Sequence, residues 1–282
     1  YLLGTGINMN AFGFAKTLGD RNTNAVAVSL TSFNIGEIQR TTVQQPEGGI
    51  GTFSPSIVNI SLGYAKKFSN AIKGGIAFRM ISESLADAKA TGVAIDAGIQ
   101  YSARLGDSEK KSSHFGISLR NVGTPMQYSG DGFSNRASIQ GNDYPQTMQL
   151  KTSSFELPSS LEMSIAQDIY FGEQNGQRLT LAGQFTSNSF TRDQFSIGAE
   201  YGLTEIIQVR GGLLYEKDIF SDESFATVYS GPSAGFSIDV PFGEEKELDD
   251  GGTRQSKFTF DYSFRATRNF DGVHSLGVSL TL

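Results

Sequence analysis

The chain has 282 residues, 38% of them hydrophobic, and it contains 33 glycines but neither cysteine nor tryptophan. The lack of cysteine excludes a disulfide framework and zinc–thiolate sites. The formal net charge is −6 without a basic tract, which argues against nucleic acid as a partner. No apolar run approaches the roughly 18 residues of a transmembrane helix. Because the sequence starts at Tyr1 and shows no signal peptide, we expect a mature or truncated chain whose targeting segment has been removed.

Segments of about ten residues alternate apolar and polar side chains throughout the chain. Near the C-terminus, for example, Phe258, Phe260, Tyr262 and Phe264 alternate with Thr, Asp and Ser. Successive side chains of a strand point to opposite faces, so each segment has one apolar and one polar face. The thirteen segments are residues 8–18, 24–35, 58–68, 71–81, 93–101, 114–120, 160–168, 178–185, 194–201, 206–216, 228–240, 257–264 and 274–282.

The pattern predicts a single all-β domain over residues 1–282, folded as a transmembrane antiparallel up-and-down β-barrel of the outer-membrane type. Such barrels have even strand numbers in bacteria, so we expect about 14 strands. The additional strand is expected before about Asn8, either outside the sequence or as a remnant at residues 1–6. Helical spacing is not sustained, although residues 82–90 fit one or two helical turns.

The connections alternate between tight and long. The tight ones are residues 18–24, 68–71 and 201–206, and the long ones are residues 36–57, 121–159 and 217–227. Outer-membrane barrels have short periplasmic turns and long extracellular loops, so a periplasmic C-terminus places all three long connections outside. Residues 242–256 do not fit, because this long acidic connection is then periplasmic.

Charged side chains gather on the polar faces of the segments. The candidate lumen residues are Arg79, Asp96, Arg120, Glu162, Glu200, Arg210, Asp239 and Asp261, accompanied by Lys73, Gln100 and Glu216. A lysine or arginine on the lipid face costs roughly 2–4 kcal/mol near the midplane, so this placement supports a barrel. Both signs are mixed, which favours lumen ion pairs over a charged conduit or a ligand site.

No catalytic motif accompanies the two histidines, His114 and His274. We therefore expect that the chain is not an enzyme and that it binds neither a cofactor nor a metal ion. The glycine-rich residues 46–52 lack the lysine of a phosphate loop. Asp131 and the pair Asp249–Asp250 lack the spacing of an EF-hand. Solvated loops explain these segments better.

Ala90–Tyr101 resembles a segment of the PorV/PorQ family of Bacteroidota outer-membrane proteins. Ser61–Phe68 and Gly116–Gly123 are similar to hairpins of that family, and Phe260–Tyr262 with His274–Gly277 is similar to its closing strands. The family belongs to the FadL-like group of 14-stranded barrels. The chain departs from it in lacking an Asn-Pro-Ala-Gly-Leu-like stretch near the N-terminus and in ending at Leu282 rather than at an aromatic residue.

The resemblance implies a non-enzymatic component of type IX protein secretion in the outer membrane. Its partners would be the large translocon barrel, the C-terminal domains of exported cargo, and outer-membrane lipids or lipopolysaccharide. The long loops at residues 36–57 and 121–159 are the expected docking surfaces. The candidate docking residues are Pro46, Phe53, Tyr128, Phe133, Tyr144 and Phe155.

Four alternatives stay open at this stage. A FadL-like transporter of hydrophobic small molecules predicts an apolar pocket and a lateral gap in the wall. An accessory barrel of another outer-membrane assembly machine uses the same surfaces as the favoured hypothesis. A lipid-modifying enzyme needs a nucleophile and a base at the rim. A soluble β-sandwich fits least, because its inner faces would have to be apolar.

Overall fold

The computed structural model describes residues 6–19, 23–104, 112–138, 144–171, 177–204, 206–221, 227–247, 253–268 and 271–282. Thirteen long strands form one antiparallel sheet in which each strand pairs with the next long strand of the chain. They are β1 Asn8–Leu18, β2 Asn24–Asn34, β5 Ser56–Lys67, β6 Ile72–Leu85, β7 Ala88–Ala103, β8 Ser113–Gly123, β13 Ser160–Phe171, β14 Gln177–Asn188, β15 Gln194–Gly202, β16 Ile207–Glu216, β17 Tyr229–Glu247, β18 Thr253–Thr267 and β19 Val273–Thr281. All thirteen predicted segments are confirmed as strands. The prediction succeeds because one face of the sheet is apolar and the other polar, so side chains alternate in polarity along each strand.

Six short strands lie within the long connections. They are β3 Ile38–Gln39, β4 Thr52–Phe53, β9 Met126–Gln127, β10 Ser134–Ala137, β11 Gln146–Gln149 and β12 Ser154–Phe155. They form three two-stranded ladders, β3–β4, β9–β12 and β10–β11. One 3-10 turn, Asp131–Phe133, precedes β10. The described residues contain no α-helix.

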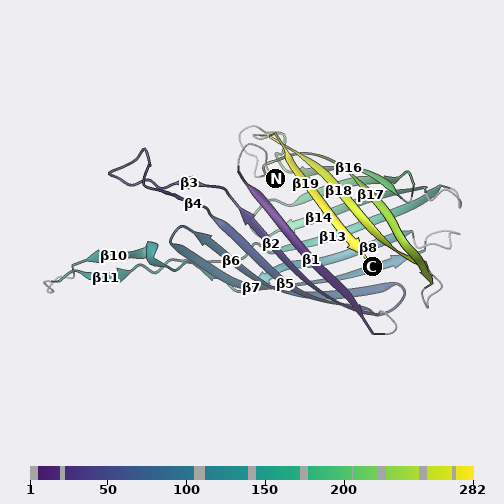
Figure 1. Cartoon of the computed structure of the whole chain (residues 1–282), viewed down its shortest axis with the longest axis horizontal. Coiled ribbons are helices and arrows are strands. Elements are labelled where there is room, and N and C mark those ends of the chain that lie inside the picture. The colour runs from purple at the N-terminus through teal and green to yellow at the C-terminus, as the bar shows by residue number, and fades with distance from the viewer. Residues whose placement is uncertain are drawn as a thin grey trace.

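The large sheet curls. Figure 1 shows β1 and β19 on the side near the viewer, while β8, β13 and β14 lie behind them. Within the part of the chain that is described, no ladder joins β1 to β19, so both strands keep one edge without a strand partner.

The two ends of the curled sheet differ. Because neighbouring strands alternate in direction, β2, β8 and β16, which precede the three long connections, all end at the same side of the sheet, which we name the long-loop end. The hairpins β3–β4 and β10–β11 project from it in Figure 1. β1, β5 and β15, which precede the three tight connections, end at the opposite side, which we name the short-turn end. The predicted asymmetry of the connections is confirmed.

Two predictions about local structure are wrong. Residues 82–90 are not helical: β6 runs to Leu85, a tight turn places Ala86 at φ 49°, and β7 starts at Ala88. Residues 242–256 are not a long loop, because β17 continues to Glu247 and β18 starts at Thr253 with a register shift between Phe242 and Lys246. The period of two is hidden at the second site because the bulge interrupts it and the charged residues there lack an apolar face.

The outward face of the sheet is apolar and exposed. Leu62 faces Phe78 across one ladder and Phe78 faces Ile95 across the next, so the apolar positions continue from strand to strand. Large side chains in this band are mostly solvent-accessible, for example Ile76 at 61% and Ile197 at 65%. Soluble monomers rarely expose a continuous apolar surface of this kind, which is typical of a surface that contacts a membrane or another protein.

Aromatic side chains mark the border of the apolar band at the short-turn end. Four strands that run towards this end, β5, β7, β13 and β15, carry an outward aromatic residue within their last few positions: Tyr64, Tyr101, Phe171 and Tyr201. The Tyr101 and Phe115 rings lie 6.3 Å apart, and the Phe171 and Tyr201 rings 6.5 Å apart. Aromatic belts of this kind flank the apolar zone of membrane barrels.

Candidate functional site

The inner face of the sheet carries a first ladder of ion pairs across β6, β7, β8 and β13. The Arg79 guanidinium pairs with Asp96 on the adjacent strand and also donates to Asn121 Oδ1 over 3.0 Å. The Asn121 backbone N–H donates to the second Asp96 oxygen over 2.8 Å. Arg120 Nη1 lies 3.2 Å from Glu162 Oε1. Opposite charges therefore alternate from strand to strand.

A second ladder crosses β14, β15, β16 and β18. Arg178 Nη2 lies 2.8 Å from Glu200 Oε1, and Arg210 Nε lies 3.8 Å from the other Glu200 oxygen. Arg210 Nη2 also lies 3.4 Å from Asp261 Oδ1, and the Ser237 hydroxyl hydrogen-bonds to both of these residues. Each carboxylate thus faces at least one guanidinium on another strand.

A further ion pair, separate from the two ladders, lies between β17 and β18. Lys257 Nζ lies 2.7 Å from Asp239 Oδ2, and the Thr259 hydroxyl donates to the other oxygen over 2.6 Å. All eight candidate lumen residues therefore form ion pairs. Glu216 is almost fully buried and accepts a hydrogen bond from Gln194 over 2.8 Å. Partly exposed pairs such as Arg120–Glu162 and Arg178–Glu200 stabilise a fold by at most about 1 kcal/mol each, whereas the Arg79–Asp96 pair is largely shielded from solvent.

His114 stands in a hydrogen-bonded network that sequence reasoning missed. Its Nδ1 lies 2.9 Å from Ser102 Oγ, and its Nε2 lies 3.2 Å from Asp168 Oδ2. The Thr180 hydroxyl donates to the other Asp168 oxygen over 2.6 Å. The network ties β7, β8, β13 and β14 together near the short-turn end.

Ser102, His114 and Asp168 are of the types found in the catalytic triad of a serine hydrolase. Such an enzyme also needs free backbone N–H groups to bind an oxyanion, and the neighbouring ones are occupied. The backbone N–H groups of Ser102, Ser112 and Asp168 all donate to ladder carbonyls, at 2.7–3.0 Å. Ser102 itself is only 8% exposed. The geometry therefore suits a structural tie better than acyl transfer.

His274 lies on the outward face of β19. The Tyr262 hydroxyl and His274 Nδ1 are 2.8 Å apart, and the Phe264 and His274 rings are 5.1 Å apart. The two histidines thus lie on opposite faces of the sheet. They do not form a common site.

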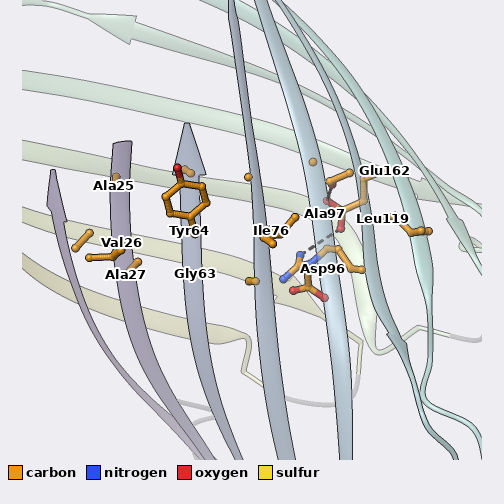
Figure 2. Close-up of a pocket in the computed structure, with 17 residues that line it drawn as sticks. Ala25, Val26, Ala27, Gly63, Tyr64, Ile76, Asp96, Ala97, Leu119 and Glu162 are labelled. Atoms are coloured by element: carbon orange, nitrogen blue, oxygen red, sulfur yellow. Dashed lines mark hydrogen bonds and ion pairs between the residues drawn. The ribbon is translucent and has the colours of Figure 1, made fainter. Parts of the chain in front are cut away.

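A hollow of about 540 Å³ follows the concave inner face from β1 to β13. Small residues form most of its wall: Ala15, Ala25, Ala27, Gly63, Ala65, Gly75, Ala77 and Gly98. Figure 2 shows Ala25, Ala27 and Gly63 at one side of this hollow and Asp96 and Glu162 at the other. A second hollow of about 530 Å³ follows the face from β13 to β18 and is lined by the second ladder.

A small apolar cluster closes over the inner face at the long-loop end. Its buried members are Ile81, Ala90, Ala94, Met126 and Leu157. The Tyr128 and Phe155 rings stack against this cluster with centroids 5.4 Å apart. The Tyr128 hydroxyl donates to Glu83 Oε2 over 2.6 Å, and burial together with this carboxylate raises the pKa of Tyr128 to about 12. The long loop is therefore anchored onto β6 and β7.

The β3–β4 hairpin is attached by a second anchor. Arg40 donates to both carboxylate oxygens of Asp87, at 2.9 and 3.1 Å, and its guanidinium lies 6.0 Å from the centre of the Phe53 ring. The hydrogen bonds and the charge of Arg40 lower the pKa of Asp87. Asp87 forms the β6–β7 turn, so the hairpin is fixed to the rim of the sheet.

The structure divides the candidate docking residues into two groups. Tyr128, Phe155 and Phe53 take part in the anchors, and Phe133 is half-buried. Pro46 and Tyr144 are exposed, Tyr144 to 79%. Exposed aliphatic residues also occupy the projecting hairpins: Ile38, Val43, Ile50, Met148 and Leu150. Sequence reasoning missed these, although isolated aliphatic residues in polar loops were a usable signal.

The remaining loop motifs bring no chemistry together. Gly48, Gly49 and Gly51 have φ values between 85° and 127°, and the chain continues into β4 rather than into a helix. Asp131 starts the 3-10 turn, whereas Asp249 and Asp250 lie outside the described residues. The described residues hold no cluster of histidine and acidic side chains suited to a metal ion. None of their helical turns is long and apolar enough to cross a membrane.

No protein-family profile matches the chain, and no curated protein matches it. Among solved structures, it is similar to BauA, the ferric preacinetobactin receptor of Acinetobacter baumannii, with a TM-score of 0.33 and 11% sequence identity. The alignment covers 98% of this chain and 55% of that receptor, so the chain spans about half the receptor's length. Likeness at this level carries no argument about function.

Proposed function

We propose that the chain is an outer-membrane β-barrel whose long-loop end binds protein partners. The observation that carries the proposal is the division of the sheet into an exposed apolar outer face and an inner face of paired charges. Exposing the apolar outer face to water would be strongly unfavourable, and placing the charged inner face in hydrocarbon would be unfavourable as well. A curled sheet with lipid outside and water inside satisfies both faces.

We expect closure by a fourteenth strand. With thirteen antiparallel strands in sequence, β1 and β19 run in the same direction, so an antiparallel seam needs one more strand running from the short-turn end to the long-loop end. Unpaired backbone groups in hydrocarbon cost several kcal/mol each, which makes open edges untenable in a bilayer. The resemblance to the FadL-like group supports the same strand number.

The partner proposed from the PorV-like segment Ala90–Tyr101 is the type IX translocon barrel together with exported cargo domains. The exposed apolar side chains of the projecting hairpins, such as Val43, Tyr144 and Leu150, provide a binding surface.

Affinity purification from native membranes in mild detergent tests this partner. We expect the tagged chain to copurify a large translocon barrel or exported cargo, and the double variant Tyr144→Ser/Leu150→Ser to retain less than about a tenth of it, because two apolar anchors are lost together. The matched control is Gln149→Ser, an exposed polar position of the same hairpin. Absence of any translocon component from the unmodified sample contradicts the proposal.

A transporter of hydrophobic small molecules is the second candidate. The apolar inner hollow favours it, because it provides a pocket. The charged ladders beside the hollow argue against transport of a hydrophobic molecule, because they make the path polar. Native mass spectrometry distinguishes the two: a lipid retained by the unmodified chain and lost in Gly63→Leu supports transport.

A further inference from the structure

We infer that the inner wall encloses a water-filled conduit for small hydrophilic solutes and ions. This inference rests on the proposed closed barrel and adds an activity to it.

The first argument is the size of the side chains that point inward. Between the two ends of the sheet the inward positions of the edge strands are small: Ala11, Gly13 and Ala15 on β1, with Ser275 and Gly277 on β19. The inward residues of β2, β5 and β6 that line the 540 Å³ hollow are also small: Ala25, Ala27, Gly63, Ala65, Gly75 and Ala77. Side chains fill the interior of eight-stranded barrels, and 16–18-stranded ones leave an aqueous channel. At an intermediate strand number, small inward residues favour an open lumen.

The second argument is the continuity of the free space. The 540 Å³ hollow shares Gly98 and Glu162 with a hollow of about 450 Å³, which shares Gln100 and Gly116 with one of about 430 Å³. That one shares Ala182 and Gly198 with the 530 Å³ hollow.

The shared residues connect β1 to β18 around the inner wall. Since a water molecule takes about 30 Å³ of liquid, each of the two large hollows has room for more than about ten waters.

The third argument is the chemistry of the wall. The two ladders place guanidinium and carboxylate groups on alternate strands, and hydroxyls such as Ser118, Thr180 and Ser263 lie between them. Charged and hydroxyl groups of this kind retain water, whereas a purely apolar cavity stays dry. They are densest in the 530 Å³ hollow, while in the 540 Å³ hollow Asp96, Arg120 and Glu162 stand at one side of a wall of small apolar residues. Because the charges are paired, ions of both signs pass with weak selectivity.

The fourth argument concerns the mouth. The cluster around Met126 and Leu157 covers the inner face of β6 and β7 at the long-loop end. The second ladder stands on β14 to β18, away from this cluster. The covered side narrows the entrance and leaves the part of the wall that carries the second ladder open at this end.

Planar-bilayer conductance tests the conduit. The unmodified chain is expected to give stable ion conductance, and Ala27→Trp/Ala77→Trp is expected to reduce it at least twofold because two indoles enter the 540 Å³ hollow. The matched control is Val28→Trp, the neighbouring outward position on β2, which is expected to leave conductance unchanged. Arg210→Glu is expected to shift the selectivity towards cations, because it leaves Glu200 and Asp261 without this counter-ion.

Heat-modifiable migration on denaturing gels, recorded first on vesicle-inserted protein, separates the two levels of the proposal. Inserted, folded protein without conductance overturns the conduit and leaves the barrel proposal intact. Equal conductance of the inward and outward tryptophan variants also overturns it, since the current would then not pass along this wall. Protein that does not insert at all overturns the barrel proposal and the conduit with it.

Discussion

At the scale of single residues, alternation in the sequence predicts which face a side chain occupies but not which partner it meets. Arg79 and Asp96 were placed on the polar face correctly, because a period of two needs only local information. The Asp168 partner of His114 is 54 positions away in the chain, and the register that brings them together depends on the long connection between β8 and β13. The network was therefore beyond sequence reasoning.

Tyr128 provides a prediction at this scale. Its pKa is raised from 10.0 to about 12, so the neutral phenol that donates to Glu83 is fully present below pH 10 and is lost as the pH rises through about 12. The difference between the alkaline absorbance titrations of the unmodified chain and of Tyr128→Phe should therefore show one tyrosine ionising near pH 12.

Glu83→Gln is the companion variant for this titration. Removing the carboxylate should move the ionisation of Tyr128 towards lower pH, because an adjacent negative charge no longer opposes it. A difference titration between the unmodified chain and Tyr128→Phe that is centred near pH 10 would contradict the anchoring of this loop.

At the scale of elements, the long strands were predictable and the short ones were not. Ladders such as β3–β4 and β9–β12 contain two residues per strand, too few for a period to register. The strand extension in residues 242–256 was missed because a bulge between Phe242 and Lys246 breaks the alternation. Element ends and loop hairpins thus depend on contacts that the sequence pattern does not encode.

The β3–β4 hairpin provides a prediction at this scale. Asp87→Asn removes the carboxylate that binds Arg40, so a spin label at Val43→Cys should become more mobile, without a change in global unfolding. In the unmodified chain the lowered pKa of Asp87 keeps this contact fully present above the ordinary aspartate value of 3.8, and the contact is lost only as the pH falls through the lowered pKa.

The spectrum of the label at pH 7 and at pH 3 measures this effect, and the cysteine-free chain needs no other change. Glu47→Gln, an acidic residue of the same hairpin, is the control. Identical label mobility in Asp87→Asn and in the unmodified chain would show that Arg40 does not hold the hairpin.

At the scale of the whole molecule, the sequence predicted the sheet and the asymmetry of its ends, whereas closure stays a prediction. The strand count followed from periodicity in individual segments, but the relation of β1 to β19 depends on curvature accumulated over all thirteen strands.

The assignment of one sheet face to lipid and the other to water provides the prediction at this scale. Leu62→Arg places a charge in the outer band and should lower the free energy of unfolding in vesicles by about 2–4 kcal/mol. The matched substitution Ser61→Arg, one position earlier on the inward face of β5, should lower it by much less. Denaturant unfolding of the two variants decides, and equal losses would contradict the assigned faces.

The open edges of β1 and β19 also determine an order of assembly. Every ladder in the large sheet joins long strands that follow one another along the chain, and only β2–β5 and β8–β13 are separated by inserted short strands. Pairing β19 with the closing strand expected before β1 closes a loop of more than 250 residues, at an entropic cost of about 5 kcal/mol compared with about 1–2 kcal/mol for a tight hairpin. Folding should thus begin with local hairpins and finish at the seam, so that synthesis of the last strand sets the earliest moment at which the wall can be completed.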